Sequence, residues 1–229
     1  MAVSAALVVF GGFAPTYYLK GLSGTPTLSP LVHVHGIVFT MWIALFLTQT
    51  ALISARRADL HRFIGMAGGV LAVAMLVVGT AVAIAAAKRP NTLNEALGLP
   101  PPLVFLVIPL GDLAAFAVLV AGGLYNRRNR EVHKRLMLLA TIAILNAGFG
   151  RLVFPGGVLA FLRLPVSPLT LIGLTGLFVA ACLVYDRMTR GRVHAAFLWG
   201  GVFILACQIV RLFVAGTTAW LTFARWLTS

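Results

Sequence analysis

The chain has 229 residues, of which 60% are hydrophobic and only 10% are charged, and its formal net charge is +13. A soluble domain of this size carries a larger share of charged residues, so the composition and the mean hydropathy of +1.00 exclude an ordinary soluble protein and indicate a membrane protein. The positive charge lies in short segments between apolar runs, where membrane topology explains it, so we expect no nucleic-acid partner.

Seven apolar runs follow one another, each near the length of about 20 residues that a helix needs to cross a bilayer. They cover residues 3–19, 29–54, 63–87, 102–125, 136–154, 166–185 and 195–219. Lipid cannot satisfy open backbone groups, so every run is predicted to be helical. The sequence therefore predicts an all-α fold, a polytopic transmembrane bundle of seven helices, with residues 1–229 forming a single integral membrane domain.

Three basic segments, at residues 56–62, 127–134 and 187–194, each separate two apolar runs. Each contains a histidine that opens the second run, and these histidines (His61, His133 and His194) are 72 and 61 positions apart. This spacing is that of a helical hairpin, so the pattern predicts one leading helix followed by three repeated hairpins.

The distribution of basic residues predicts the orientation of the chain. Eleven of the 18 Lys and Arg residues lie in or directly beside the three basic segments, five lie at the opposite ends of the runs, and two lie inside runs. By the positive-inside rule the basic segments face the cytoplasm. We therefore expect a multi-pass protein of a bacterial inner membrane, with a cytoplasmic N-terminus and a periplasmic C-terminus.

Several polar side chains lie deep inside the apolar runs, where ionisable groups are costly and indicate function. Four of them lie roughly 20–24 Å from the cytoplasmic ends of their runs, measured at about 1.5 Å per residue along a helix: Asp112, Arg151, Arg211 and Gln208. On the same scale Asn146 lies at about 15 Å and His35 at about 28 Å. Their shared depth predicts a polar pocket that opens toward the outer side of the membrane.

The charges in this layer favour an anionic ligand. One carboxylate (Asp112) faces two guanidinium groups (Arg151 and Arg211), and arginine suits bidentate capture of a carboxylate or phosphate. A small anionic molecule or an anionic cofactor would balance the excess charge. The alternative is a structural ion pair between Asp112 and one arginine, while the other arginine extends toward the interface.

The histidines allow a second hypothesis. His61, His133 and His194 sit at one depth beside basic residues, so two of them are candidates to clamp a haem b, whereas His35 is a candidate ligand of a haem on the outer side. The alternative for the inner three is an interfacial capping or anchoring role. His35 and Asp112 alone make too few ligands for a metal ion, so we predict no metal site from them.

Several phrases resemble an uncharacterised family of bacterial multi-pass membrane proteins. The resemblance covers about half the chain, from the second to the fifth run. It rests on His61-Arg62-Phe63-Ile64-Gly65, on His133-Lys134-Arg135-Leu136-Met137, on Arg151-Leu152, and on His35-Gly36, Trp42 and Gln49. That family is similar in layout to di-haem membrane cytochromes of the b type, so the resemblance implies a helical membrane protein with electron transfer as one option.

The chain departs from the cytochrome pattern, in which one helix carries two histidines 13 or 14 residues apart. The corresponding places hold Gln49, Asn146 and Gln208. No hydrolase, protease or nucleotide-binding motif is present either, so the sequence assigns no reaction. A third hypothesis is an accessory or scaffold subunit that packs against other membrane subunits through its glycine-rich faces.

Overall fold

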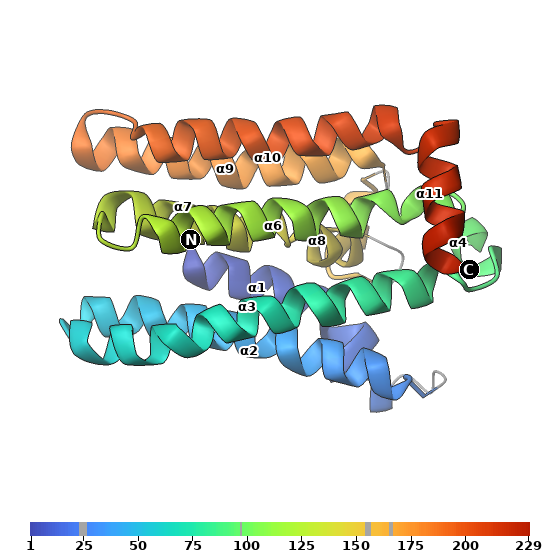
Figure 1. Cartoon of the computed structure of the whole chain (residues 1–229), viewed down its shortest axis with the longest axis horizontal. Coiled ribbons are helices and arrows are strands. Elements are labelled where there is room, and N and C mark those ends of the chain that lie inside the picture. Colours follow the sequence, from blue (N-terminus) through green and yellow to red (C-terminus); the bar gives the residue numbers. More distant parts are fainter. Residues whose placement is uncertain (23–26, 97, 154–156, 165–166) are drawn as a thin grey trace.

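In a computed structural model of the chain, residues 1–22, 27–96, 98–153, 157–164 and 167–229 are described, and the regular structure within these ranges is helical throughout (Figure 1). The helices are α1 (Ala2–Phe13), η1 (Ala14–Tyr18), η2 (Lys20–Leu22), α2 (Pro30–Ser54), α3 (Ala58–Ala87), α4 (Thr92–Ala96), α5 (Pro102–Phe105), α6 (Val107–Tyr125), α7 (Arg130–Ala143), α8 (Asn146–Val153), η3 (Ala160–Leu162), α9 (Pro168–Arg190), α10 (Ala195–Val214) and α11 (Thr218–Thr228).

Five helical segments are long and apolar enough to cross a membrane in the described ranges: α2, α3, α5 with α6, α9 and α10. A sixth crossing results if α7 and α8, which meet at an angle of 42°, count as one bent span. The expectation of a helical membrane protein is thereby supported, with long apolar helices running side by side along the bundle (Figure 1).

The long helices are arranged as three hairpins. Helix α2 packs on α3, α6 on α7 and α9 on α10, and all three connecting turns lie at the same end of the bundle (Figure 1). These turns contain the three basic segments of the sequence, so most of the positive charge collects at that end. That the hairpins are copies of one repeat stays a prediction.

Local sequence signals explain where these helices begin and end. Asn129 accepts hydrogen bonds from the backbone N–H groups of Glu131 and Val132 and so caps α7, and Ser167 caps α9 in the same way through Thr170. Helix α9 ends at Gly191, whose φ of 70° is a conformation that glycine adopts without strain.

Two of the seven predicted runs differ from a straight span. The first, Ala2–Tyr18, is shorter than the spanning helices, and its last part is a π-helical turn that contains Pro15. The fifth is broken at Ile144 and Leu145 into α7 and α8. The seven-helix count therefore stays a prediction; the predicted end of the fifth run at residue 154 and the start of the sixth at residue 166 lie outside the described residues.

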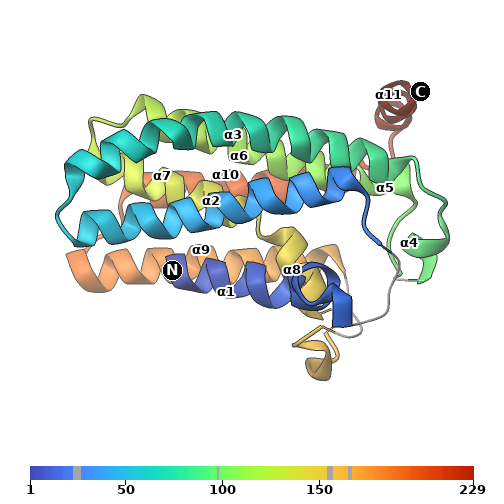
Figure 2. The same ribbon diagram turned by 90° about the horizontal axis from the view of Figure 1, so that it is seen from below.

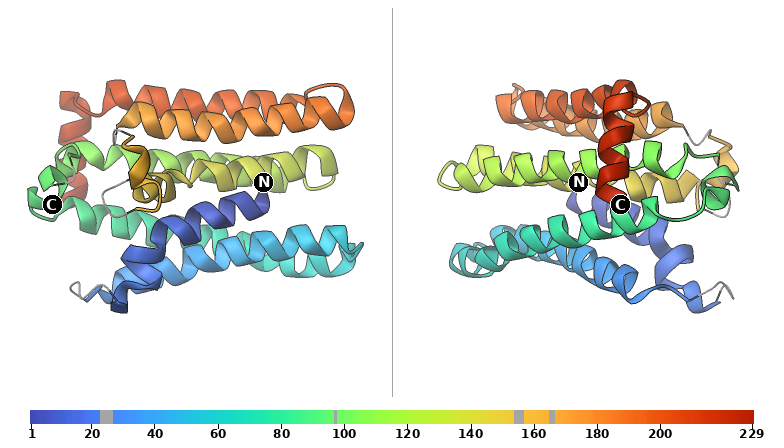
Figure 3. Two further views of the ribbon diagram at one scale, coloured as in Figure 1. Left: turned by 180° about the vertical axis from the view of Figure 1, so that it is seen from behind. Right: turned by 45° about the vertical axis from the view of Figure 1, so that its right-hand side comes forward.

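A helix that the sequence did not predict crosses the end of the bundle opposite the three hairpin turns. Helix α11 lies nearly perpendicular to the long helices (Figures 1 and 3). Its Ala224 is fully buried against a small core with Ala87 and Leu106, and the Trp220 indole N–H donates to the Leu103 carbonyl over 2.9 Å. An apolar inner face and aromatic residues at the end of a bundle are typical of a helix at the membrane interface.

The side chains on the outward faces of the long helices are apolar, like those of the core. On α3 the side chains of Phe63, Met66, Val70, Val73 and Val77 are 60–73% exposed. Their spacing of three or four residues places them on one face of the helix. In water such a stripe would be a large exposed apolar patch, so it is suited to contact with lipid.

Helix α1 packs closely on α8 (Figure 2). A methyl group added at Gly12 would lie 2.5 Å from the backbone oxygen of Gly148, and backbone cannot move aside as a flexible side chain can. The close approach of the two helices therefore depends on Gly12.

We expect Gly12→Ala to lower the stability of the protein by about 1–3 kcal/mol, the usual cost of overpacking a close contact. Thermal unfolding in detergent measures the change. Gly173→Ala, in α9, is the matched control, since no atom lies within 4 Å of an added methyl group there. Equal unfolding temperatures for the two variants would contradict the close packing of α1 on α8.

Candidate functional site

A buried network of polar side chains occupies the middle of the bundle. The Arg211 guanidinium on α10 forms an ion pair with Asp112 on α6 and donates a hydrogen bond to the Ile108 carbonyl over 3.2 Å. Asn146, the first residue of α8, donates its side-chain N–H to the Asp112 carboxylate over 2.8 Å. The break between α7 and α8 thus places an amide beside the carboxylate.

The network continues to a fourth helix. The Thr175 hydroxyl on α9 donates to Asn146 Oδ1 over 3.0 Å, and Gln208 Nε2 lies 3.1 Å from Thr175 Oγ1 and 3.3 Å from Asn146 Oδ1. Asn146 and Gln208 are each 2% exposed, and Thr175 is fully buried. Sequence reasoning missed Thr175, because a single hydroxyl in an apolar helix gives no signal of its own.

Four of the six predicted ligand residues therefore meet in one network, namely Asp112, Asn146, Gln208 and Arg211. Within this group the single carboxylate neutralises the single guanidinium, and the polar groups bond mainly to one another. Such an arrangement joins four helices and has no excess charge for a ligand to balance. It matches the structural ion pair that the sequence left as an alternative.

Arg151, the fifth residue, points elsewhere. Its Cζ lies 4.2 Å from the centre of the Phe13 ring on α1, a distance at which a cation is attracted to the aromatic face. One of its terminal nitrogens donates to the Ala147 carbonyl one turn earlier, over 3.0 Å. Neither contact neutralises the positive charge.

No carboxylate side chain neutralises Arg151. The chain has five acidic residues, all of them described, and each contacts another polar group. The contacts are Asp59 with Arg57, Glu95 with Asn91, Asp112 with Arg211, Glu131 with Lys134, Arg135 and Arg190, and Asp186 with Arg135. Arg151 is thus a guanidinium within the apolar runs that no carboxylate side chain contacts.

His35, the sixth residue, lies on α2, a helix that contributes no residue to the Asp112 network. The ring stacks on Phe39 with 4.1 Å between the ring centres, and its Nδ1 is buried without a hydrogen-bond partner among the described residues. Gly36 allows this part of α2 to approach Tyr17 closely, since an added methyl group would overlap the phenol ring.

The four histidines proposed as haem ligands do not form one group. His61 and His133 lie side by side, with their ring centres 6.3 Å apart. His194 instead accepts the Ala196 N–H over 3.1 Å and caps α10, and burial and the nearby Arg135 lower its pKa. This is the capping role that the sequence left as an alternative.

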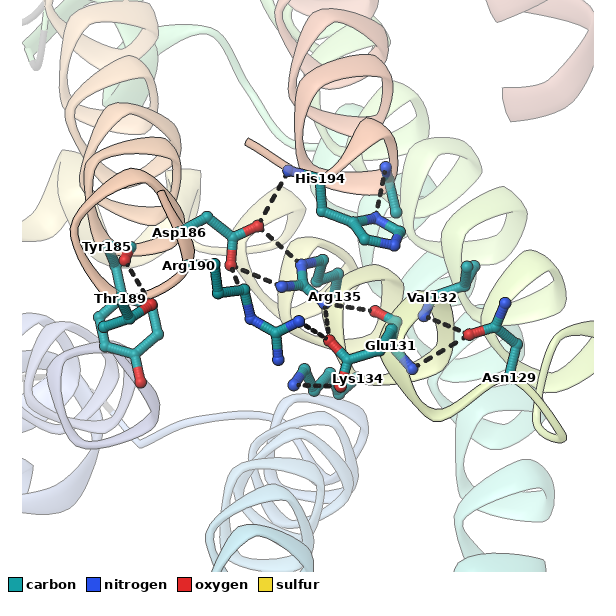
Figure 4. A network of polar contacts seen from close by, with 11 residues as sticks. Asn129, Glu131, Val132, Lys134, Arg135, Tyr185, Asp186, Thr189, Arg190 and His194 are labelled. Carbon is teal, nitrogen blue, oxygen red and sulfur yellow. Dashed lines mark hydrogen bonds and ion pairs between the residues drawn. The ribbon is translucent and has the colours of Figure 1, made fainter. Parts of the chain in front are cut away.

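A second polar network lies at the ends of α7, α9 and α10 that are next to the hairpin turns (Figure 4). Arg135 and Asp186, each 1% exposed, form a two-pronged ion pair with N–O distances of 2.9 and 2.6 Å. Asp186 also accepts the His194 backbone N–H over 3.1 Å. Glu131 forms ion pairs with Arg135 and Arg190 as well.

Sequence reasoning missed this second network because it grouped Arg135 with the cations of the basic segments. A signal was present, since Asp186 is one of only five acidic residues and immediately precedes the basic segment that starts at Arg187. The network connects α7 to the hairpin of α9 and α10. It lies near the hairpin turns, whereas the Asp112 network lies further along the helices.

Two hollows open at the end of the described structure opposite the hairpin turns. One, of 270 Å³, is lined by Arg211 together with apolar residues of α5, α6 and α10, and the other, of 440 Å³, lies near Arg89 and Leu221. No cluster of three or more His, Cys, Asp or Glu side chains suited to a metal ion occurs in the part of the chain that the structure describes.

No family model, no curated protein and no solved structure matches the chain. The function is therefore inferred from the geometry described above.

Proposed function

We propose that this protein is a multi-pass protein of a bacterial inner membrane that binds a small anionic molecule at Arg151. The orientation follows from the basic turns, which lie together at one end and are therefore assigned to the cytoplasm. The N-terminus then faces the cytoplasmic side and the C-terminus the periplasm. Arg151 falls in the half of the bundle toward the periplasm.

The observation that carries the proposal is the uncompensated charge of Arg151. At an effective dielectric constant of 20, a unit charge 4 Å from a guanidinium gains about 4 kcal/mol. An anion is therefore expected to bind beside Arg151. Arg211 is a weaker candidate despite its hollow, because Asp112 already neutralises it and an added anion would leave excess negative charge there.

The surroundings of Arg151 favour a carboxylate or phosphate group. A guanidinium presents parallel N–H donors that match two oxygens of such a group. Phe13 covers one face of the guanidinium, and one terminal nitrogen donates to the Ala147 carbonyl, which leaves the other N–H groups for a ligand. A small molecule with one anionic group and an apolar body fits this chemistry best.

We expect Arg151→Gln to abolish the stabilisation of the protein by anions. Phosphate or benzoate at 100 times its dissociation constant should stabilise the wild-type protein by about 2.7 kcal/mol, because each would bind only the folded state. The measurement is the thermal unfolding temperature in detergent with and without each anion. Arg151→Lys should retain part of the response, since lysine keeps the charge but not the paired donors.

Arg225→Gln is the matched control, because Arg225 is an exposed arginine on α11 at the same end of the bundle. It should respond to anions as the wild-type protein does. If Arg151→Gln kept the full response, or if the wild-type protein gave none, Arg151 would be an arginine that extends to the interface. The hypothesis of a scaffold subunit would then be favoured.

A further inference from the structure

The inner histidines of the first two hairpins form a second candidate site, separate from Arg151. His61 lies in the first turn of α3 and His133 in the first turn of α7. Their ring centres are 6.3 Å apart and their ring planes are inclined at 87°. The two hairpin turns therefore bring two imidazoles from different hairpins to the same place.

One hydrogen bond sets the tautomer of His133. Its Nδ1 lies 2.8 Å from the carbonyl oxygen of Gly123 on α6. A carbonyl oxygen only accepts, so Nδ1 must carry the hydrogen, and Nε2 of the neutral ring then has a free lone pair. A backbone carbonyl on the other ring nitrogen is the usual support of a histidine that binds a metal.

Unpartnered polar atoms gather beside His61. Its own Nδ1 is buried without a hydrogen-bond partner, as are both Oε1 and Nε2 of Gln49 on α2, within the described part of the chain. A methyl group added at Gly65, one turn after His61 on α3, would lie 3.6 Å from Gln49 Nε2, so the Gln49 amide lies on the same face of α3 as His61. Each buried polar atom without a partner costs about 1–3 kcal/mol, so a ligand that bonds to these atoms would stabilise the cluster.

The spacing of the two rings fits one metal ion between them. Two imidazoles bound on opposite sides of one ion, each with a metal–nitrogen distance of about 2 Å, have ring centres roughly 6 Å apart. Perpendicular ring planes are compatible with this arrangement, because each ring can turn about its own metal–nitrogen bond.

We infer that His61 and His133 bind one transition-metal centre between the first two hairpins, with the Gln49 amide beside it. Imidazole ligands favour iron, copper or zinc, whereas magnesium and calcium prefer carboxylate and carbonyl oxygens. Two imidazoles complete the coordination of a haem iron, whereas a free ion would also need the Gln49 amide and water as ligands. The shared chemistry is metal ligation by two neutral imidazoles.

The test is the metal content and the absorption spectrum of the detergent-purified, full-length protein, oxidised and then reduced with dithionite. We expect about one metal atom per chain in the wild-type protein, lost from His61→Ala and His133→Ala. The loss of affinity should exceed the roughly 10–100-fold effect of removing an outer-shell partner. A Soret band would identify haem iron, and metal without a Soret band would identify a free ion.

His33→Ala is the control, because His33 is exposed at the opposite end of the bundle. It should keep the metal. Gln49→Leu keeps both histidines, and it should weaken metal binding without abolishing it. A wild-type protein that contains no metal and takes up neither Cu²⁺, Zn²⁺ nor haem would overturn the inference, as would full metal content in a folded His133→Ala variant.

Discussion

Asp186→Ala is expected to destabilise the protein by about 1–3 kcal/mol, the usual cost of leaving buried polar groups without a partner, because Arg135 keeps its ion pair with Glu131. Arg135 would remain buried at 1% exposure and would lose both of its hydrogen bonds to the carboxylate. The His194 backbone N–H at the start of α10 would lose its acceptor as well. Reversible unfolding in mixed detergent micelles measures the change in the free energy of unfolding.

Two variants test the reason for this loss. The double variant Arg135→Met, Asp186→Leu removes both charges and should recover most of the stability, because a buried ion pair is often replaced by apolar side chains at little cost. Asp59→Ala removes a carboxylate from an exposed pair with Arg57 and should leave stability unchanged. An Asp186→Ala variant as stable as Asp59→Ala would contradict a buried pair.

Asp112→Ala should have a larger effect, about 3–5 kcal/mol, the usual cost of removing one partner of a buried ion pair. Arg211 is 7% exposed and would keep its charge without a counter-ion, and the Asn146 side-chain N–H would lose its acceptor. Because the network joins α6, α8, α9 and α10, the loss should appear as lower stability of the whole bundle. Unfolding in the same micelles measures it.

The matched variant for this network is Asp112→Leu with Arg211→Met, which should recover most of the lost stability. This pair also separates the two arginines of the membrane interior. We expect the Arg211 network to govern stability and Arg151 to govern anion binding. A stability loss for Arg151→Gln as large as that for Asp112→Ala would contradict this division.

Much of the architecture follows from composition and run length. The apolar stretches that became α2, α3, α6, α9 and α10 were predicted within a few residues, because their hydrophobicity leaves few alternatives in a bilayer. The break before Asn146 was not predicted, since nothing in the local sequence forbids a continuous helix. Helix α11 was also missed, because it follows α10 within the same apolar stretch.

The candidate site was predicted only in part. Depth along a helix placed Asp112, Asn146, Gln208 and Arg211 in one layer, and they do form one network. Depth alone does not say which way a side chain points around its helix, so it also assigned Arg151 to that group. The order of the helices around the bundle decides such contacts, and it is not encoded in the pattern of one segment.

The most direct test of the central claim is native mass spectrometry of the protein released from lipid nanodiscs. We predict a bound small molecule with a carboxylate or phosphate group on the wild-type protein and on Arg225→Gln, and its loss from a folded Arg151→Gln variant. Equal occupancy of Arg151→Gln and wild type, or a wild-type protein that carries no such molecule and acquires none when phosphate or benzoate is added, would contradict an anion site at Arg151.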